Sequence, residues 1–93
     1  MVLDHHDALF VWNHDKNRKV LADHGIGPYE ASEVFFGRYH TWPTHDGRLL
    51  SVGRLGGVYY TVVWEWEGSL RRLISARRSD ARERRAYDRE DNR

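Results

Sequence analysis

With 93 residues, of which 40% are hydrophobic and 31% charged, the chain is long enough for one small domain over 1–93 with a thin core. It has no cysteine, which excludes a disulfide framework and any thiolate metal site. Its apolar runs are too short to cross a bilayer, and its first ten residues are acidic where a secretory signal is basic, so we expect a cytoplasmic protein with no membrane partner.

The first third of the chain predicts one extended segment and two helices. Residues 8–12 are an apolar run that suits a first strand or the extended lead into a helix. Asn13 is a good N-cap, and 13–24 contains neither glycine nor proline, so we expect a helix there. Pro28 favours the first turn of a second helix over 29–36, which has an apolar stripe on one face.

The remainder predicts a meander of strands followed by a helix. Gly56-Gly57 suits a two-residue hairpin turn, and Asp80 followed by Glu83 has the spacing of a capping box, so a final helix is expected to begin near position 79 or 80. The predicted strands cover 39–42, 49–55, 58–67 and 70–77. The fold class is therefore α+β: an antiparallel sheet of about four to five strands with two N-terminal helices and one C-terminal helix.

The net charge of +1 hides an uneven distribution of charge along the chain. Residues 1–70 hold six Lys or Arg against nine Asp or Glu, whereas residues 71–93 hold nine Arg against five Asp or Glu. Arginine is suited to bidentate contact with phosphate or carboxylate. The C-terminal quarter is therefore either a surface that faces an anion or a solvated helix with internal ion pairs.

Several short segments follow one another in an order and spacing that match a known pattern. They are Trp12–Lys16, His24-Gly25, 31–36, 48–53, 72–78, Glu83-Arg84 and Tyr87. With these segments the chain resembles the BrnT family of bacterial type II toxins over nearly its whole length. It departs from the family pattern at Val20, where members usually carry Asn, and at Trp64, where many carry His.

The resemblance implies a RelE-like ribonuclease toxin that cuts RNA and inhibits translation. It also implies a BrnA-like antitoxin of the ribbon-helix-helix class, which neutralises the toxin; operator DNA is then bound only through the antitoxin complex. A small domain with apolar edge strands commonly pairs with a partner, so we expect a dimer or a heterotetramer with the antitoxin. We expect no cofactor and no metal.

Metal-independent cleavage of RNA needs a base for the 2′-hydroxyl, a cation for the charge that builds on the phosphate, and an acid for the departing 5′-oxygen. Arginine stays protonated, so it cannot be the base, but its planar fork suits phosphate. We therefore take Arg72 and Arg77 as catalytic candidates, and Arg48, Arg78 and Arg84 as RNA-binding candidates.

Arg72 and Arg77 lie on or beside the last predicted strand, which can hold a charged group in place. Alternation along a strand places Arg72 on the same face as Leu70 and Ile74, where it either lines a cleft or forms a structural ion pair, for instance with Glu83 or Glu65. Arg77 at the strand end and Arg84 on the following helix are spaced to converge on one anion.

The other catalytic candidates are Lys16, His24, Glu83 and Tyr87. Of these, only His24 titrates near neutrality when unperturbed, although a histidine before a helix-ending glycine also suits a C-terminal cap. Lys16 is either solvated or functional. Glu83 and Tyr87 are four residues apart and face the same way on a helix; the Tyr87 ring either packs on the sheet or takes part in acid–base chemistry.

Aromatic and histidine side chains leave further alternatives. Trp42, Trp64 and Trp66 are either stacking platforms for unpaired bases or the core itself. His40 and His45 are expected in a loop, without the helical spacing of a zinc site, so we predict no metal site.

Two functions remain open for the chain. One is an RNA endonuclease toxin held inactive by an antitoxin. The other is a catalytically inactive module on the same fold, which binds nucleic acid or an acidic protein. Both predict a basic C-terminal face, and only the first predicts fragments of RNA.

Overall fold

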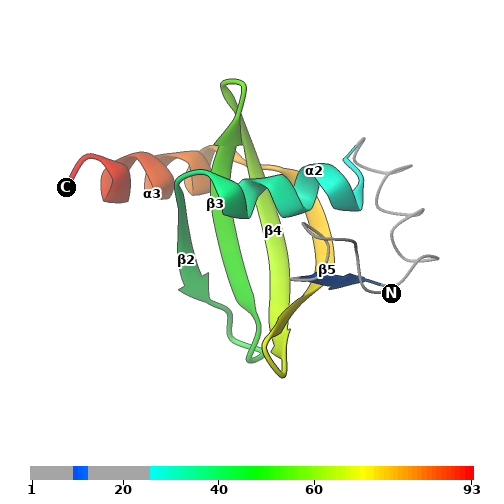
Figure 1. The fold of residues 1–93 in the computed structure, drawn as a ribbon. Coiled ribbons are helices and arrows are strands. Elements are labelled where there is room, and N and C mark those ends of the chain that lie inside the picture. Colours follow the sequence, from blue (N-terminus) through cyan, green and yellow to red (C-terminus); the bar gives the residue numbers. More distant parts are fainter. Residues whose placement is uncertain (1–9, 13–25) are drawn as a thin grey trace.

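The computed structural model describes residues 10–12 and 26–93, and the predicted helix over 13–24 lies outside them. The described residues form five strands, two α-helices and a short 3-10 helix (Figure 1). The strands are β1 (Phe10–Trp12), β2 (Tyr39–Pro43), β3 (Leu49–Leu55), β4 (Val58–Glu67) and β5 (Leu70–Arg78). The helices are α2 (Pro28–Glu33), the 3-10 helix η2 (Val34–Phe36) and α3 (Ala81–Asp91). None of these helices is long and apolar enough to span a membrane.

The strands form one mixed sheet in the order β1-β5-β4-β3-β2. Strands β2 to β5 are an antiparallel meander, as predicted, and Gly56 and Gly57 both have positive φ in the β3–β4 turn. The prediction of a purely antiparallel sheet is wrong at one edge, because β1 pairs with β5 in parallel. A tight turn forces antiparallel pairing, whereas the long connection from β1 to the meander leaves its direction free.

Helices α2 and α3 lie against opposite faces of the sheet, which we call the α2-side face and the α3-side face (Figure 1). Side chains of β4 alternate between the two faces. Val62 and Trp64 belong to the core on the α2-side face, whereas Tyr59 and Thr61 bond to residues of α3.

A β-bulge interrupts the regular alternation of β5. Val63 pairs with Ser75 and Trp64 pairs with Leu73, so Ile74 has no partner in the β4–β5 ladder. The extra residue moves every side chain after it in β5 to the face opposite to the one that strict alternation predicts.

The bulge brings Arg72 and Arg77 to the same face of the sheet. Strict alternation would separate two residues that are five apart in a strand. Instead, Arg72 lies opposite Glu65 and Arg77 lies opposite Thr61, both on the α3-side face. Leu70 lies opposite Glu67 and so shares this face with Arg72, as alternation predicts, whereas Ile74 is the bulged residue and has no partner in the ladder.

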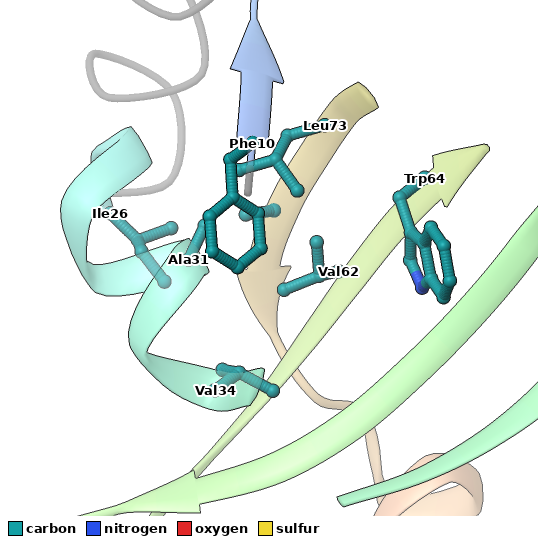
Figure 2. Packing of buried hydrophobic residues seen from close by; sticks show 8 residues of the cluster. Phe10, Ile26, Ala31, Val34, Val62, Trp64 and Leu73 are labelled. Atoms are coloured by element: carbon teal, nitrogen blue, oxygen red, sulfur yellow. The ribbon is translucent and has the colours of Figure 1, made fainter. Parts of the chain in front are cut away.

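The hydrophobic core fills the space between α2 and the sheet (Figure 2). Phe10 of β1 is fully buried there and lies close to Val62 and Leu73. Ile26 and Val34 close the core from the helix side, each 1% exposed. Burial of such side chains stabilises the fold by about 1.5–3 kcal/mol each, so the Phe10 ring helps to hold the short strand β1 in place.

Trp64 is part of this core, the second of the two alternatives for it. It is 3% exposed, its ring meets Phe35 edge-on at 5.5 Å, and its Nε1 donates to Ser51 Oγ at 2.8 Å. The guanidinium of Arg71 stacks over the rings of Trp64 and Trp66 at 5.1 and 5.0 Å. The indole N–H of Trp64 is thus paired within the core. In family members that carry histidine at position 64, the same backbone position would place the imidazole in the core on the α2-side face.

The last helix is fixed at both ends. Asp80 Oδ1 accepts a hydrogen bond from the Glu83 N–H at 2.8 Å, and Glu83 Oε1 accepts one from the Asp80 N–H at 2.9 Å, which confirms the capping box. At the other end, Asp91 Oδ1 lies 3.1 Å from His40 Nε2 and 3.4 Å from Arg38 Nη1. His40 lies in β2, within the strand predicted over 39–42 and not in a loop, and its contact with Asp91 ties α3 to the sheet.

Gly53→Ala is expected to destabilise the fold by about 1–3 kcal/mol, because overpacking forces neighbours to move. A Cβ at Gly53 would lie 2.8 Å from Cγ1 of Val34 and 3.4 Å from the Arg38 carbonyl oxygen. Gly37→Ala is the matched control, since a Cβ there meets nothing within 4 Å. Urea unfolding measures both; equal stability of the two variants would contradict the tight contact.

Candidate functional site

Arg77 and Glu83 form the shortest ion pair among the described residues. Nη1 and Nη2 of Arg77 donate to Oε1 and Oε2 of Glu83, both at 2.6 Å. The Glu83 side chain is 12% exposed and the Arg77 side chain 36%. The bidentate pair uses two of the five N–H donors of the guanidinium, so Arg77 is a fixed cation that still has donors for an anion.

Glu83 is held as a carboxylate. Burial alone would raise its pKa, but hydrogen bonds from Arg77, from the Asp80 backbone and from Thr61 outweigh burial and lower the pKa. The bond to Glu83 in turn raises the pKa of Arg77. A general base works best with a pKa near the operating pH, so these surroundings favour a positioning role for Glu83 over a role as the base.

Glu83→Gln is expected to remove part of the pH dependence of stability. Because the pKa of Glu83 is lower in the folded than in the unfolded chain, its contribution is present above the ordinary value of 4.5 and is lost as the pH falls through the lowered value. Glutamine keeps an oxygen for the Asp80 N–H but has no charge for Arg77. Urea unfolding at pH 7 and at acidic pH compares the two proteins; a difference in stability that stays constant with pH would contradict the low pKa.

Arg72 lies on the same face as Arg77. Of the two carboxylate partners that the sequence suggested for it, Glu83 and Glu65, the structure pairs it with Glu65. Its Nε is 3.9 Å from Glu65 Oε1, and its Nη1 donates to Glu67 Oε1 at 3.2 Å. All three side chains are 40 to 49% exposed. Exposed pairs of this kind contribute about 0–1 kcal/mol, so a phosphate can compete for the Arg72 guanidinium.

The three RNA-binding candidates lie at separate places. Arg48 follows the β2–β3 turn and its side chain is 40% exposed. Arg78 ends β5 on the α2-side face. Arg84 Nη1 donates to the carbonyl oxygen of Ser79 at 2.8 Å, so the guanidinium groups of Arg84 and Arg77 have different partners.

Tyr87 packs on the sheet, which is one of its two alternatives. The residue is 4% exposed, and its ring lies edge-on to His40 at 5.1 Å and to Tyr59 at 5.6 Å. Burial raises the pKa of the hydroxyl, which donates to the Arg38 carbonyl oxygen at 3.5 Å. Glu83 and Tyr87 both face the sheet, as their spacing predicts.

Of the remaining candidates, only His45 belongs to the part of the chain that the structure describes. Lys16 and His24 lie outside the described residues. His45 lies in the β2–β3 turn, away from the His40–Asp91 contact. Within 10–12 and 26–93 there is no group of three or more His, Asp or Glu that could hold a metal.

Sequence reasoning did not anticipate a groove of about 560 Å³ on the α3-side face. It lies between the β2–β3 hairpin and α3, and Glu83 contributes to its wall. Other lining residues are Trp42, His45, Leu50, Val52, Arg82 and Ala86. Two signals in the sequence point there: Arg82 and Ala86 are four apart on one side of a helix, and Trp42 and Leu50 flank the hairpin at paired positions.

Two comparisons connect the chain to known proteins. A family model described as "Ribonuclease toxin, BrnT, of type II toxin-antitoxin system" matches residues 12–83, which include Arg72, Arg77 and Glu83. The chain is also similar to the crystal structure of the Brucella abortus ribonuclease toxin BrnT, with a TM-score of 0.65 and 25% identity, over 76% of this chain and 95% of that chain. No curated protein matches the chain.

Proposed function

The chain belongs to the BrnT family of ribonuclease toxins of type II toxin–antitoxin systems, and from this premise we propose that it is an endoribonuclease that cleaves RNA and thereby inhibits translation. In the proposed reaction the 2′-oxygen attacks the adjacent phosphorus and the P–O5′ bond breaks. A base takes the proton of the 2′-hydroxyl and an acid protonates the 5′-oxygen. The products are a 2′,3′-cyclic phosphate and a 5′-hydroxyl.

The observation that carries the proposal is the fixed guanidinium of Arg77. A transferring phosphoryl group is stabilised by donors that are already oriented before the reaction. Glu83 holds Arg77 by two hydrogen bonds, and Thr61 holds Glu83 at 3.0 Å. Arg72 is a second cation on the same face. Arg77 is proposed as the group that stabilises the phosphate charge, with Arg72 as an additional phosphate contact.

Acid and base are proposed to come from the N-terminal half of the chain. Glu83 has a lowered pKa and full hydrogen bonding, and Tyr87 is buried with a raised pKa, so both suit structural roles around Arg77. Lys16 and His24 remain the proposed proton-transfer groups, since an imidazole titrates near neutral pH.

A BrnA-like ribbon-helix-helix antitoxin is the proposed partner, in a dimer or heterotetramer that binds operator DNA through the antitoxin. Support comes from the family, whose description names a toxin–antitoxin system. Because cellular RNA is the proposed substrate, we propose that the protein acts in the cytoplasm. RNA is recognised through Arg72, Arg77 and the candidates Arg48, Arg78 and Arg84.

Induced expression in a bacterium tests the proposed function. We expect growth arrest when this chain is expressed alone and normal growth when the neighbouring antitoxin gene is expressed with it. The Arg77→Ala variant, expressed to the same soluble level, should permit growth. Normal growth with soluble wild-type protein would contradict the toxin function and leave the inactive binding module.

A further inference from the structure

The groove on the α3-side face is lined by an aromatic ring, by apolar side chains and by charged residues of α3 and its N-cap. Trp42 is half-buried and lies opposite Leu50 in the β2–β3 ladder, and Ala86 of α3 faces them. His45 and Arg82 are exposed at the rim. Ligand sites in proteins are usually about 300–1,000 Å³, so a groove of about 560 Å³ is large enough for a nucleotide.

The groove holds charges of both signs, and both of its carboxylates are bound to the first turn of α3. Its two carboxylates are already engaged: Asp80 accepts the N–H of Glu83, and Glu83 accepts bonds from Arg77, Thr61 and the Asp80 N–H. Arg82, in contrast, makes no hydrogen bond or ion pair with any described residue. The lining of the groove therefore offers a ligand both an unpaired cation, Arg82, and the indole ring of Trp42.

The groove adjoins a stripe of arginines along α3, made of Arg82, Arg85 and Arg89. Because a helix turns 100° per residue, these three lie within about 60° of one another, over about 10.5 Å of the helix axis. All three are exposed and lack hydrogen bonds and ion pairs within the described part of the chain. By contrast, Arg72 and Arg77 each have a carboxylate partner. The stripe is thus a row of unneutralised charge.

We propose that the groove and this stripe bind single-stranded RNA, with a nucleobase stacked on Trp42 and the flanking phosphates on Arg82, Arg85 and Arg89. The inference rests on the proposed ribonuclease function and adds a binding subsite to it. Aromatic faces with a basic track are the combination by which proteins hold unpaired strands. An acidic peptide would satisfy the arginine stripe but would not use the flat indole face, so RNA is the better match.

Binding of a strand that cannot be cleaved tests the subsite apart from catalysis. The probe is a fluorescent 2′-O-methyl RNA of about 10 nucleotides, in the size range of single-strand sites. Trp42→Ala should weaken its binding about 5- to 100-fold, and the matched surface change Trp66→Ala, on the other face, should leave the affinity within about 2-fold. Trp42→Phe should restore most of the binding, which separates stacking from a folding defect.

The arginine stripe has its own matched pair of variants. Arg82→Ala with Arg85→Ala should weaken binding and reduce the slope of log K against log salt by about 1.4, since each single-strand phosphate contact contributes about 0.7. Arg38→Ala with Arg54→Ala removes the same charge from exposed positions outside α3 and should leave the slope nearly unchanged.

The outcomes separate the inference from the proposed function. Wild-type protein that cleaves RNA, with Trp42 and stripe variants that bind the probe normally, would overturn the inference and leave the ribonuclease intact. Wild-type protein that binds the probe but does not cleave RNA would contradict the proposed ribonuclease function and still support the RNA-binding subsite. If the variants lose affinity for a glutamate decapeptide and keep it for the probe, the surface is a protein interface and the inference fails.

Discussion

Arg77→Ala is expected to reduce the rate of RNA cleavage about 100- to 1,000-fold, which is the usual loss when one oriented donor is removed from a reacting oxyanion. We expect an effect of this size because Glu83 already fixes the Arg77 guanidinium before substrate binds. Single-turnover cleavage of a labelled RNA measures the effect. A folded Arg77→Ala variant that cleaves RNA at the wild-type rate would contradict the proposed role of Arg77 in the reaction.

The control for this prediction must separate chemistry from folding. Arg77→Ala leaves the buried Glu83 carboxylate without its cation, which costs about 1.5–3 kcal/mol of stability. Glu83→Gln disturbs the same pair from the other side and serves as the matched variant. It should lower cleavage less than Arg77→Ala does and leave the shape of the pH–rate profile unchanged. Loss of the acidic limb of that profile in Glu83→Gln would instead identify Glu83 as the general base.

Trp64→Ala is expected to destabilise the fold by about 3–5 kcal/mol, the largest effect on stability of any single substitution considered for this chain. The side chain is 3% exposed, its ring contacts Phe35, and its Nε1 is paired with Ser51. Its loss leaves a cavity, removes the hydrogen bond to the Ser51 hydroxyl, and takes away one of the rings on which the Arg71 guanidinium stacks. Denaturant unfolding measures the free energy.

Trp66→Ala is the matched control for Trp64. It removes the same side chain from the next position on the same face of β4, where 54% of the residue is exposed. We expect a loss of less than about 1.5 kcal/mol, which is the value of the edge-on contact between the two rings. If both variants lose equal stability, the assignment of Trp64 to the core is wrong.

Local chemistry explains why much of the fold could be predicted from the sequence. The Gly56-Gly57 turn needs positive φ, so the hairpin and its flanking strands follow from the residues themselves. The capping box likewise defined the start of α3 at Asp80. The parallel β1 could not be predicted in the same way, because it pairs with the strand farthest from it in sequence, and long-range packing of Phe10 decides its place.

The candidate site depends on two structural features that cannot be predicted from a local sequence pattern. The bulge at Ile74 sets Arg72 and Arg77 on one face, whereas alternation of side chains predicts opposite faces. The groove is built by Trp42 and Arg82, from elements 40 residues apart in sequence, so only the packing of α3 on the sheet reveals it. The ion pair of Arg77 with Glu83, six residues apart, also depends on that packing.

The most direct test of a ribonuclease toxin is the chemistry of its products. Purified wild-type protein is incubated with a 5′-labelled RNA in the presence of EDTA, and the new ends are identified by mass spectrometry. We predict discrete fragments that end in a 2′,3′-cyclic phosphate and begin with a 5′-hydroxyl, and the same fragments formed about 100- to 1,000-fold more slowly with Arg77→Ala. Intact RNA from folded wild-type protein, or fragments with a 5′-phosphate, would contradict the proposed reaction.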